Sequence, residues 1–152
     1  MTSHHLALEY TDPLSGGGGV PYVPETMSGF PSGGITPPYG KLWAETNRST
    51  DKPYLNFTVA ELDVVNGMTN FQYWNGYLKP RHNRYIALPN YSKVDYEPTP
   101  YPDNPNPQCL CGYNSNSYVS GLPYSGAVKN VPNGFFTAFP GFSDPVPNQY
   151  FQ

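Results

Sequence analysis

Prolines and glycines interrupt this sequence every few residues, and that interruption constrains its fold more than any other feature. The 152 residues include 19 prolines and 15 glycines, together about 22% of the chain against a usual share of about 12%. Closely spaced prolines disfavour helix and bias a chain toward extended geometry. Only residues 52–89 carry apolar side chains dense and regular enough to fold on one another. We therefore expect one small central module between two long flanks.

The first part of this central module predicts a short helix. Thr58 and Glu61 have the spacing of a capping box, in which each side chain satisfies a backbone N–H of the first turn. Apolar residues follow at helical spacing over 59–65, and Asn66-Gly67 is typical of a C-terminal stop. The valines of the same stretch are also compatible with a strand.

The second part of the module predicts a β-hairpin. Asn75-Gly76 lies between the aromatic runs 71–74 and 77–79, and Asn-Gly favours the type I′ turn of tight hairpins. Pro80 would end the second strand, because it cannot donate to the ladder. Further strands are expected at 84–88 and 54–57.

Composition sets the size of the core and the fold class. Leu, Ile, Val and Phe together make up about 20% of the chain, the level at which burial barely offsets the entropy of ordering. Charged residues are only 12%, and 14 Tyr, 8 Phe and 2 Trp are present, whereas disordered segments are charged and poor in aromatics. We predict a mostly irregular fold with small β content, α+β at most. Its central sheet or hairpin and one short helix would be flanked by long Pro/Gly-rich arms.

The chain is expected to divide into four parts. These are an extended N-terminal arm at 1–51, the central module at 52–89, a Pro-rich spacer at 90–108 and an aromatic, turn-rich C-terminal arm at 109–152. Within the first arm, the alternation of Leu6, Leu8 and Tyr10 suggests an edge strand that could pair with another subunit. The aromatic residues expected to contact partners are Tyr22, Phe30, Tyr39, Trp43, Phe135, Phe136, Phe139 and Phe142.

Several classes of function find no support in the sequence. The net charge of −3 comes with no basic stripe for nucleic acid. No apolar run approaches the roughly 20 residues that span a membrane. The N-terminus lacks the basic start and apolar run of a signal peptide, which argues against secretion by that route. Residues 34–41 superficially resemble a phosphate loop, but Pro37-Pro38 remove N–H donors and the spacing is one residue too long.

The residues that could carry chemistry favour structural roles. Cys109 and Cys111 are too close in sequence for an unstrained disulfide and too few for a zinc site, so free thiols are expected. His4-His5 are expected to be solvated, and so is the basic cluster around Pro80, formed by Lys79, Arg81, His82 and Arg84. His82 has no flanking apolar support, and an enzymatic role would require it to be buried beside a carboxylate or Cys109. The sequence predicts no enzyme, no cofactor and no metal. The sequons at Asn47, Asn56 and Asn90 are close to the number that chance supplies.

The overall composition resembles that of minor capsid or cement proteins of large DNA viruses and tailed phages. The likeness covers the whole chain and rests on no family motif, so it assigns no residue roles. It implies a virion protein that bridges neighbouring capsid subunits through extended arms and aromatic anchors. A subunit of an extracellular filament or surface layer is the alternative, which a cleavable leader or a glycan on the sequons would favour. A third is a carbohydrate- or peptide-binding module, which needs the aromatics gathered on one concave face.

Overall fold

The computed structural model describes residues 7–10, 24–34, 38–51, 61–62, 67–98, 112–123, 128–129, 139 and 141–152. They form a small α+β fold with much irregular chain. A three-stranded antiparallel sheet has the order β1-β2-β3, with β1 at Leu8–Tyr10, β2 at Glu25–Pro31 and β3 at Leu42–Thr46. Two two-stranded pairs accompany it. One joins β4, Glu61–Leu62, to β7, Val128–Lys129, and the other joins β5, Asp95–Tyr96, to β6, Gly112–Tyr113.

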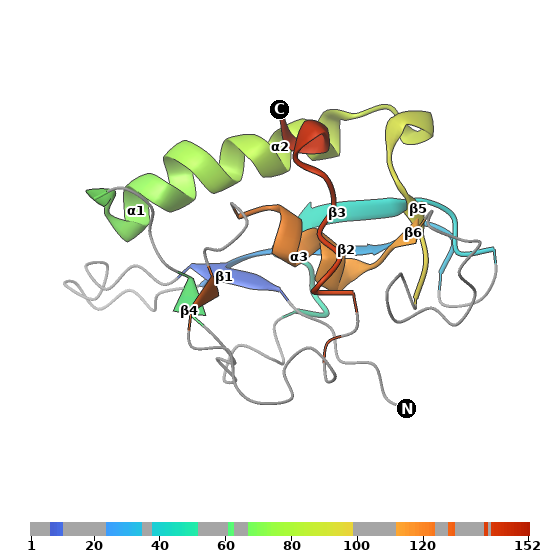
Figure 1. Ribbon diagram of the computed structural model, residues 1–152, viewed down its shortest axis with the longest axis horizontal. Coiled ribbons are helices and arrows are strands. Elements are labelled where there is room, and N and C mark those ends of the chain that lie inside the picture. The colour runs from blue at the N-terminus through green and yellow to red at the C-terminus, as the bar shows by residue number, and fades with distance from the viewer. Residues whose placement is uncertain are drawn as a thin grey trace.

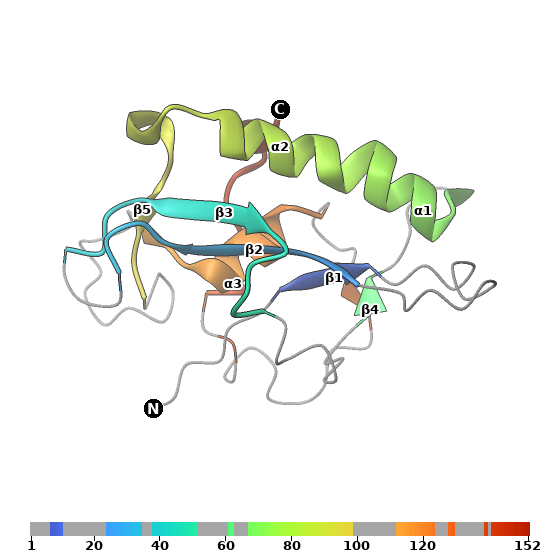
Figure 2. The same cartoon turned by 180° about the vertical axis from the view of Figure 1, so that it is seen from behind.

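The longest element is a continuous helix from Asn70 to Ala87. It comprises α1 (Asn70–Tyr73), the π-helical η3 (Trp74–Leu78) and α2 (Lys79–Ala87). The other helices are η4 (Asn90–Ser92), α3 (Ser115–Gly121) and η5 (Asn148–Phe151). Figures 1 and 2 show the long helix along one side of the sheet, with α3 on one face of the strands.

This long helix corrects the predicted hairpin at 71–79 and the predicted strand at 84–88. Thr69 begins it with a capping box, because its hydroxyl accepts from Gln72 N at 3.2 Å and the Gln72 side chain accepts from Thr69 N at 2.9 Å. Pro80 lies in the first turn of α2, directly after the π-helical turn, where the Lys79 N–H bonds to the Trp74 carbonyl five residues back. Because the i→i−4 pattern is already interrupted there, the N–H that proline lacks costs less than in a regular helix interior. The residues that the helix buries recur at helical spacing: Tyr73, Trp74, Leu78, Arg81, His82 and Tyr85. Burial of that face outweighs the local turn preference of Asn75-Gly76.

The predicted short helix at 59–65 is wrong where the structure describes it, because Glu61–Leu62 is a strand paired with Val128–Lys129. Its Thr58 cap lies outside the described residues, as does the predicted strand at 54–57. The edge strand suggested near the N-terminus is confirmed over Leu8–Tyr10. Its partner is β2 of the same chain, with Leu8 opposite Met27. The sheet therefore lies within residues 8–46, which the sequence assigned to an extended arm.

The apolar core lies between one face of the sheet, the long helix, α3 and the C-terminal segment. Its buried members are Leu8, Met27, Leu42, Tyr73, Trp74, Leu78, Tyr85, Val94, Tyr118, Val119, Leu122, Phe139, Val146 and Phe151. Tyr85, Tyr118 and Phe151 meet at ring-centroid distances of 5.0 to 5.6 Å. The sheet approaches α3 so closely that a Cβ on Gly29 would lie 2.9 Å from Tyr118 Cβ. Described parts of both predicted arms thus contribute to the core.

Candidate interaction surface

The eight predicted partner anchors are dispersed in the structure. Tyr22, Phe135 and Phe136 lie outside the described residues. Phe30, Tyr39 and Phe142 are half-buried, Trp43 is exposed and Phe139 is buried. Phe139 belongs to the chain's own core and Phe142 packs against it. Tyr39 packs against Tyr96 at a centroid distance of 6.0 Å. Phe30 and Trp43 are the two anchors that the fold brings together.

The exposed Trp43, with the half-buried Phe30 beside it, forms the first aromatic patch. They are cross-strand partners on β2 and β3, in edge-to-face contact with their ring centroids 6.2 Å apart. Trp43 Nε1 donates to Asn90 Oδ1 at 2.8 Å, which joins the first turn of η4 to the strand. The adjacent Tyr91 is 83% exposed, the largest exposure of any described large hydrophobic residue. We call Phe30, Trp43, Asn90 and Tyr91 the Trp43 patch.

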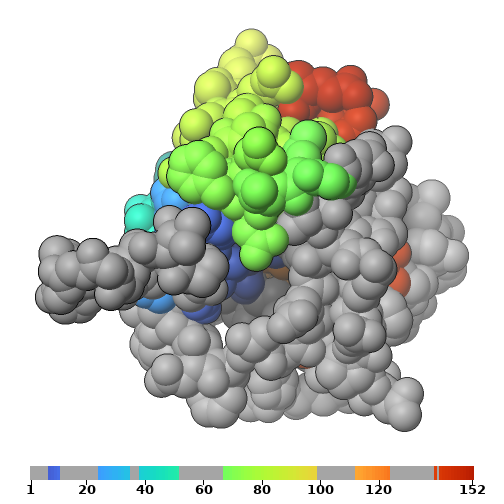
Figure 3. Space-filling model, turned by 90° about the vertical axis from the view of Figure 1, so that its left-hand side faces the viewer, coloured from blue at the N-terminus to red at the C-terminus, as the bar shows by residue number. Residues whose placement is uncertain are grey.

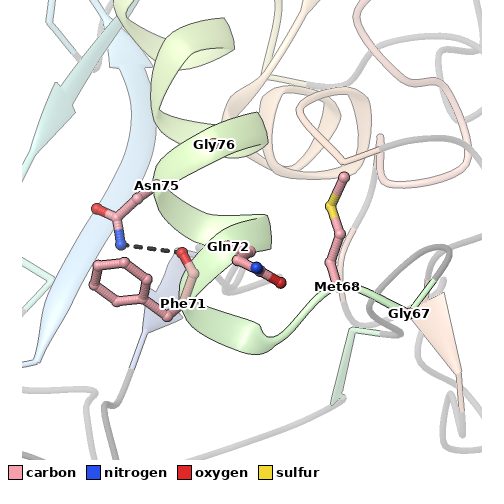
Figure 4. Close-up of a pocket in the computed structure, with 6 residues that line it drawn as sticks. All are labelled: Gly67, Met68, Phe71, Gln72, Asn75 and Gly76. Carbon is pink, nitrogen blue, oxygen red and sulfur yellow. Dashed lines mark hydrogen bonds between the residues drawn. The ribbon is translucent and has the colours of Figure 1, made fainter.

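The second exposed apolar surface is a shallow hollow at the start of the long helix. It is lined by Gly67, Met68, Phe71, Gln72, Asn75 and Gly76 and has a volume of about 570 Å³. Phe71 is 59% exposed and Met68 44%. Figure 4 shows Phe71 and Asn75 on one side of the helix and Met68 on the other. Asn75 donates to the Phe71 carbonyl at 3.1 Å. We call this surface the α1 hollow.

The α1 hollow and the Trp43 patch lie at opposite ends of the long helix. Figure 3 views the molecule from the α1 end, where the green atoms of α1 reach the surface. η4 and the start of β3 lie beyond the other end of the helix (Figure 2). A helix of this length spans about 27 Å at 1.5 Å per residue. The fold therefore displays two exposed aromatic sites on opposite sides of one small body.

Sequence reasoning missed Met68 and Phe71, because it took anchors only from outside residues 52–89. It missed Tyr91 because residues 90–108 were expected to form only a Pro-rich spacer. Part of the signal was present in the helical spacing of Phe71 and Asn75 and of Gln72 and Gly76. On a helix, residues three or four apart share a face, whereas Met68 lies before the helix begins. The predicted hairpin put Phe71 and Gly76 in different elements and concealed that face.

His82 is a fully buried polar residue of the long helix. Its ring is fully buried, with Nε2 2.9 Å from Thr46 Oγ1 and Nδ1 2.7 Å from Tyr118 OH. Burial lowers the pKa of His82 to about 4, and the negative charge of Glu25 offsets part of that shift. A neutral imidazole offers one donor and one acceptor, which two hydroxyls satisfy. His82 thus bridges β3 and α3, and the expectation that it is solvated is wrong.

Other buried polar groups also join elements of the fold. Asp51 accepts from Ser28 Oγ at 2.7 Å and from Thr26 Oγ1 at 3.4 Å on the sheet face opposite the long helix. Lys93 Nζ donates to the carbonyls of Tyr85, Ile86 and Leu88 and so caps the end of α2. These contacts satisfy buried charges with hydrogen bonds, as a stable interior requires.

The described ranges contain no cluster of three or more metal-ligating His, Cys, Asp or Glu side chains. Cys109, Cys111 and the His4-His5 pair lie outside those ranges. Among the helices that the structure describes, none has both the length and the hydropathy needed to cross a bilayer. Comparisons of the chain with protein-family models, curated proteins and solved structures found no match.

Proposed function

We propose that this protein is a non-enzymatic structural subunit of a large assembly, and specifically a minor capsid or cement protein that bridges neighbouring subunits of a virus particle. The observation that supports bridging is the pair of exposed aromatic sites, the α1 hollow and the Trp43 patch, at opposite ends of the long helix. A protein with one binding face needs only one such site, whereas a bridge needs two that neighbours can occupy at the same time.

The exposed side chains are suited to contact other proteins. Aromatic residues and Met are enriched at the centres of protein interfaces, where charged residues are depleted. Covering one large apolar side chain contributes about 1.5–3 kcal/mol. Phe71 and Tyr91, at opposite ends, are 59% and 83% exposed, so each would supply a corresponding share of this contribution. Because both sites belong to one body, binding at the first raises the effective concentration of the second.

The low charge of the chain and its Pro, Gly and Tyr content support a place within a particle. Few charged groups would need to be desolvated when neighbours cover the surface, and prolines reduce the entropy lost when extended segments dock. The assignment to a virion rests on the compositional resemblance, and it makes other structural proteins of the same particle the partners.

Site-specific photo-cross-linking tests the proposal. A photoreactive phenylalanine analogue replaces Phe71 in one variant and Trp43 in another. Each variant is incorporated into the particles in which the protein naturally occurs, and these particles are irradiated. We expect both positions to cross-link to neighbouring structural subunits. Ile86 is an exposed residue of α2 outside both sites, and the same substitution there is the control, which should cross-link far less.

The double variant Phe71→Ser with Trp43→Ser should fold but be lost from particles, while each single variant is retained at a reduced level. The proposal is wrong if the chain is recovered only as a free monomer and neither position cross-links. Cross-linking through one site alone would refute bridging in favour of a protein with a single binding face.

A further inference from the structure

A second hollow lies between α2, the end of α3 and the C-terminal segment. Arg81 lines it from α2, and Ser120, Gly121 and Pro123 line it from α3 and the residues that follow. Residues 145–148 complete the wall, and the hollow has a volume of about 240 Å³. It shares no residue with the α1 hollow or the Trp43 patch, so it is a separate feature of the fold.

The Arg81 side chain is fixed in place beside this hollow. Arg81 is only 7% exposed, and its Nε donates to the Leu122 carbonyl at 2.9 Å. Nη2 is 3.4 Å from the Gly121 carbonyl. The guanidinium lies 5.1 Å from the ring centroid of Tyr77 and 5.0 Å from that of Phe151. These contacts hold one edge of the guanidinium against the end of α3, which restricts the direction of the other edge.

The charge of Arg81 lacks a carboxylate partner in the part of the chain that the structure describes. Other cations do have one: Lys79 pairs with Glu25 at 2.8 Å and Lys41 with Asp95 at 2.7 Å. A guanidinium has five N–H donors, and only two are used by the carbonyls of residues 121 and 122. A nearly buried cation without a counter-ion is costly. An anion in the hollow would remove that cost.

We infer that this hollow binds a carboxylate group carried on a short apolar body. A carboxylate matches the planar fork of an arginine and carries one negative charge against its one positive charge. A phosphate dianion would bring a second charge against walls formed largely by Pro123, Pro145, Val146 and Pro147. The volume is below the 300–1,000 Å³ typical of drug-sized ligands, so it suits a small acid or the carboxyl end of a peptide.

Asn148 provides a test that leaves Arg81 in place. It lines the hollow and is exposed. The variant Asn148→Asp puts a negative charge into the hollow without a change of size. Gln149→Glu makes the same charge change at the next residue, which is exposed and does not line the hollow. The second variant is the matched control.

Propionate is titrated into the full chain while the Nε–H resonance of Arg81 is followed by NMR. We expect a saturable shift of that resonance, an affinity weakened about tenfold or more in Asn148→Asp by like-charge repulsion, and an unchanged affinity in Gln149→Glu. A short peptide with a free carboxyl end and its amidated form then distinguish the sources. If the peptide with a free carboxyl end binds more tightly than propionate and its amidated form does not bind, the ligand is the carboxyl end of a chain. If the peptide binds no more tightly than propionate, the ligand is a free small acid.

Three results would overturn the inference. The first is that the Arg81 Nε–H resonance does not shift when propionate is added. The second is an equal loss of affinity in the Asp and Glu variants, which would indicate a general charge effect. The third is inorganic phosphate that binds more tightly than propionate, which would contradict the carboxylate class. The inference does not depend on the proposed structural function, and none of these results bears on bridging.

Discussion

Acid should destabilise this fold through His82, and the size of the effect follows from its surroundings. The ring is fully buried between the hydroxyls of Thr46 and Tyr118, and burial lowers its pKa to about 4. In the unfolded chain the pKa returns to about 6.5. Between these values the unfolded state binds a proton that the folded state does not, so stability falls as the pH falls. The two pKa values correspond to about 3 kcal/mol, at 1.36 kcal/mol per unit. The loss begins below pH 6.5 and is complete near pH 4.

The assay is urea unfolding of the wild-type chain and of His82→Gln at several pH values from 7 to 4. Glutamine also offers a donor and an acceptor, but it does not titrate. Carboxylates and the other histidines are common to both proteins, so the difference between the two curves isolates His82. We expect the wild type to lose about 3 kcal/mol more than His82→Gln across this range. Parallel curves would show that His82 titrates normally and that the buried bridge is wrong.

Three further predictions concern close contacts and buried polar groups. Gly29→Ala should destabilise by about 1–3 kcal/mol, because its Cβ would lie 2.9 Å from Tyr118 Cβ; a thermal melt no lower than that of the wild type would contradict this. Gly76→Ala is the matched contrast. Its Cβ would meet nothing within 4 Å and it lies in a helix, so thermal unfolding should show a gain of about 0.5–1 kcal/mol; a loss would count against the helix at this position. Asp51→Ala leaves the buried Ser28 hydroxyl without its acceptor and should cost about 1–3 kcal/mol in urea unfolding; a neutral result would show that water reaches that group.

Sequence reasoning predicted the fold class but misplaced its elements. The small α+β character followed from the shortage of aliphatic residues and the frequency of prolines, which limit the length of strands and the size of the core. The error at 70–87 arose because Asn75-Gly76 is a strong local turn signal and Pro80 a strong helix breaker. Both are overridden by tertiary burial of one helical face and by the π-helical turn before Pro80. Local residue propensities reveal neither the tertiary burial nor the π-helical turn.

The sheet was missed for a different reason. Residues 25–46 are rich in Thr, Ser and Gly and lack a clear alternation of apolar residues. Ser28 and Thr26 are nevertheless buried, because Asp51 satisfies their hydroxyls. A buried polar face of this kind depends on a partner more than 20 residues away, and no periodicity search detects it. The strand at Leu8–Tyr10 was predictable because its apolar residues alternate.

Of the predicted anchors, the structure exposes Trp43 and places Phe30 beside it. Phe139 shows the limit of choosing anchors by residue type: an aromatic residue in an irregular segment fills the chain's own core as readily as a partner's groove. The basic cluster at 79–84 was read as solvated, yet Arg81 and His82 are buried. That burial follows from the helical face they share with Leu78 and Tyr85.

The most direct test of bridging is hydroxyl-radical footprinting of the chain, once as the isolated protein and once within its native particle. The rate of side-chain oxidation at Phe71, Trp43 and Tyr91 reports whether a neighbour covers the two ends of the long helix. We predict that oxidation at both ends is strongly reduced in the particle, while Ile86 reacts alike in both states. Equal oxidation of Phe71 and Tyr91 in the two states would contradict the account.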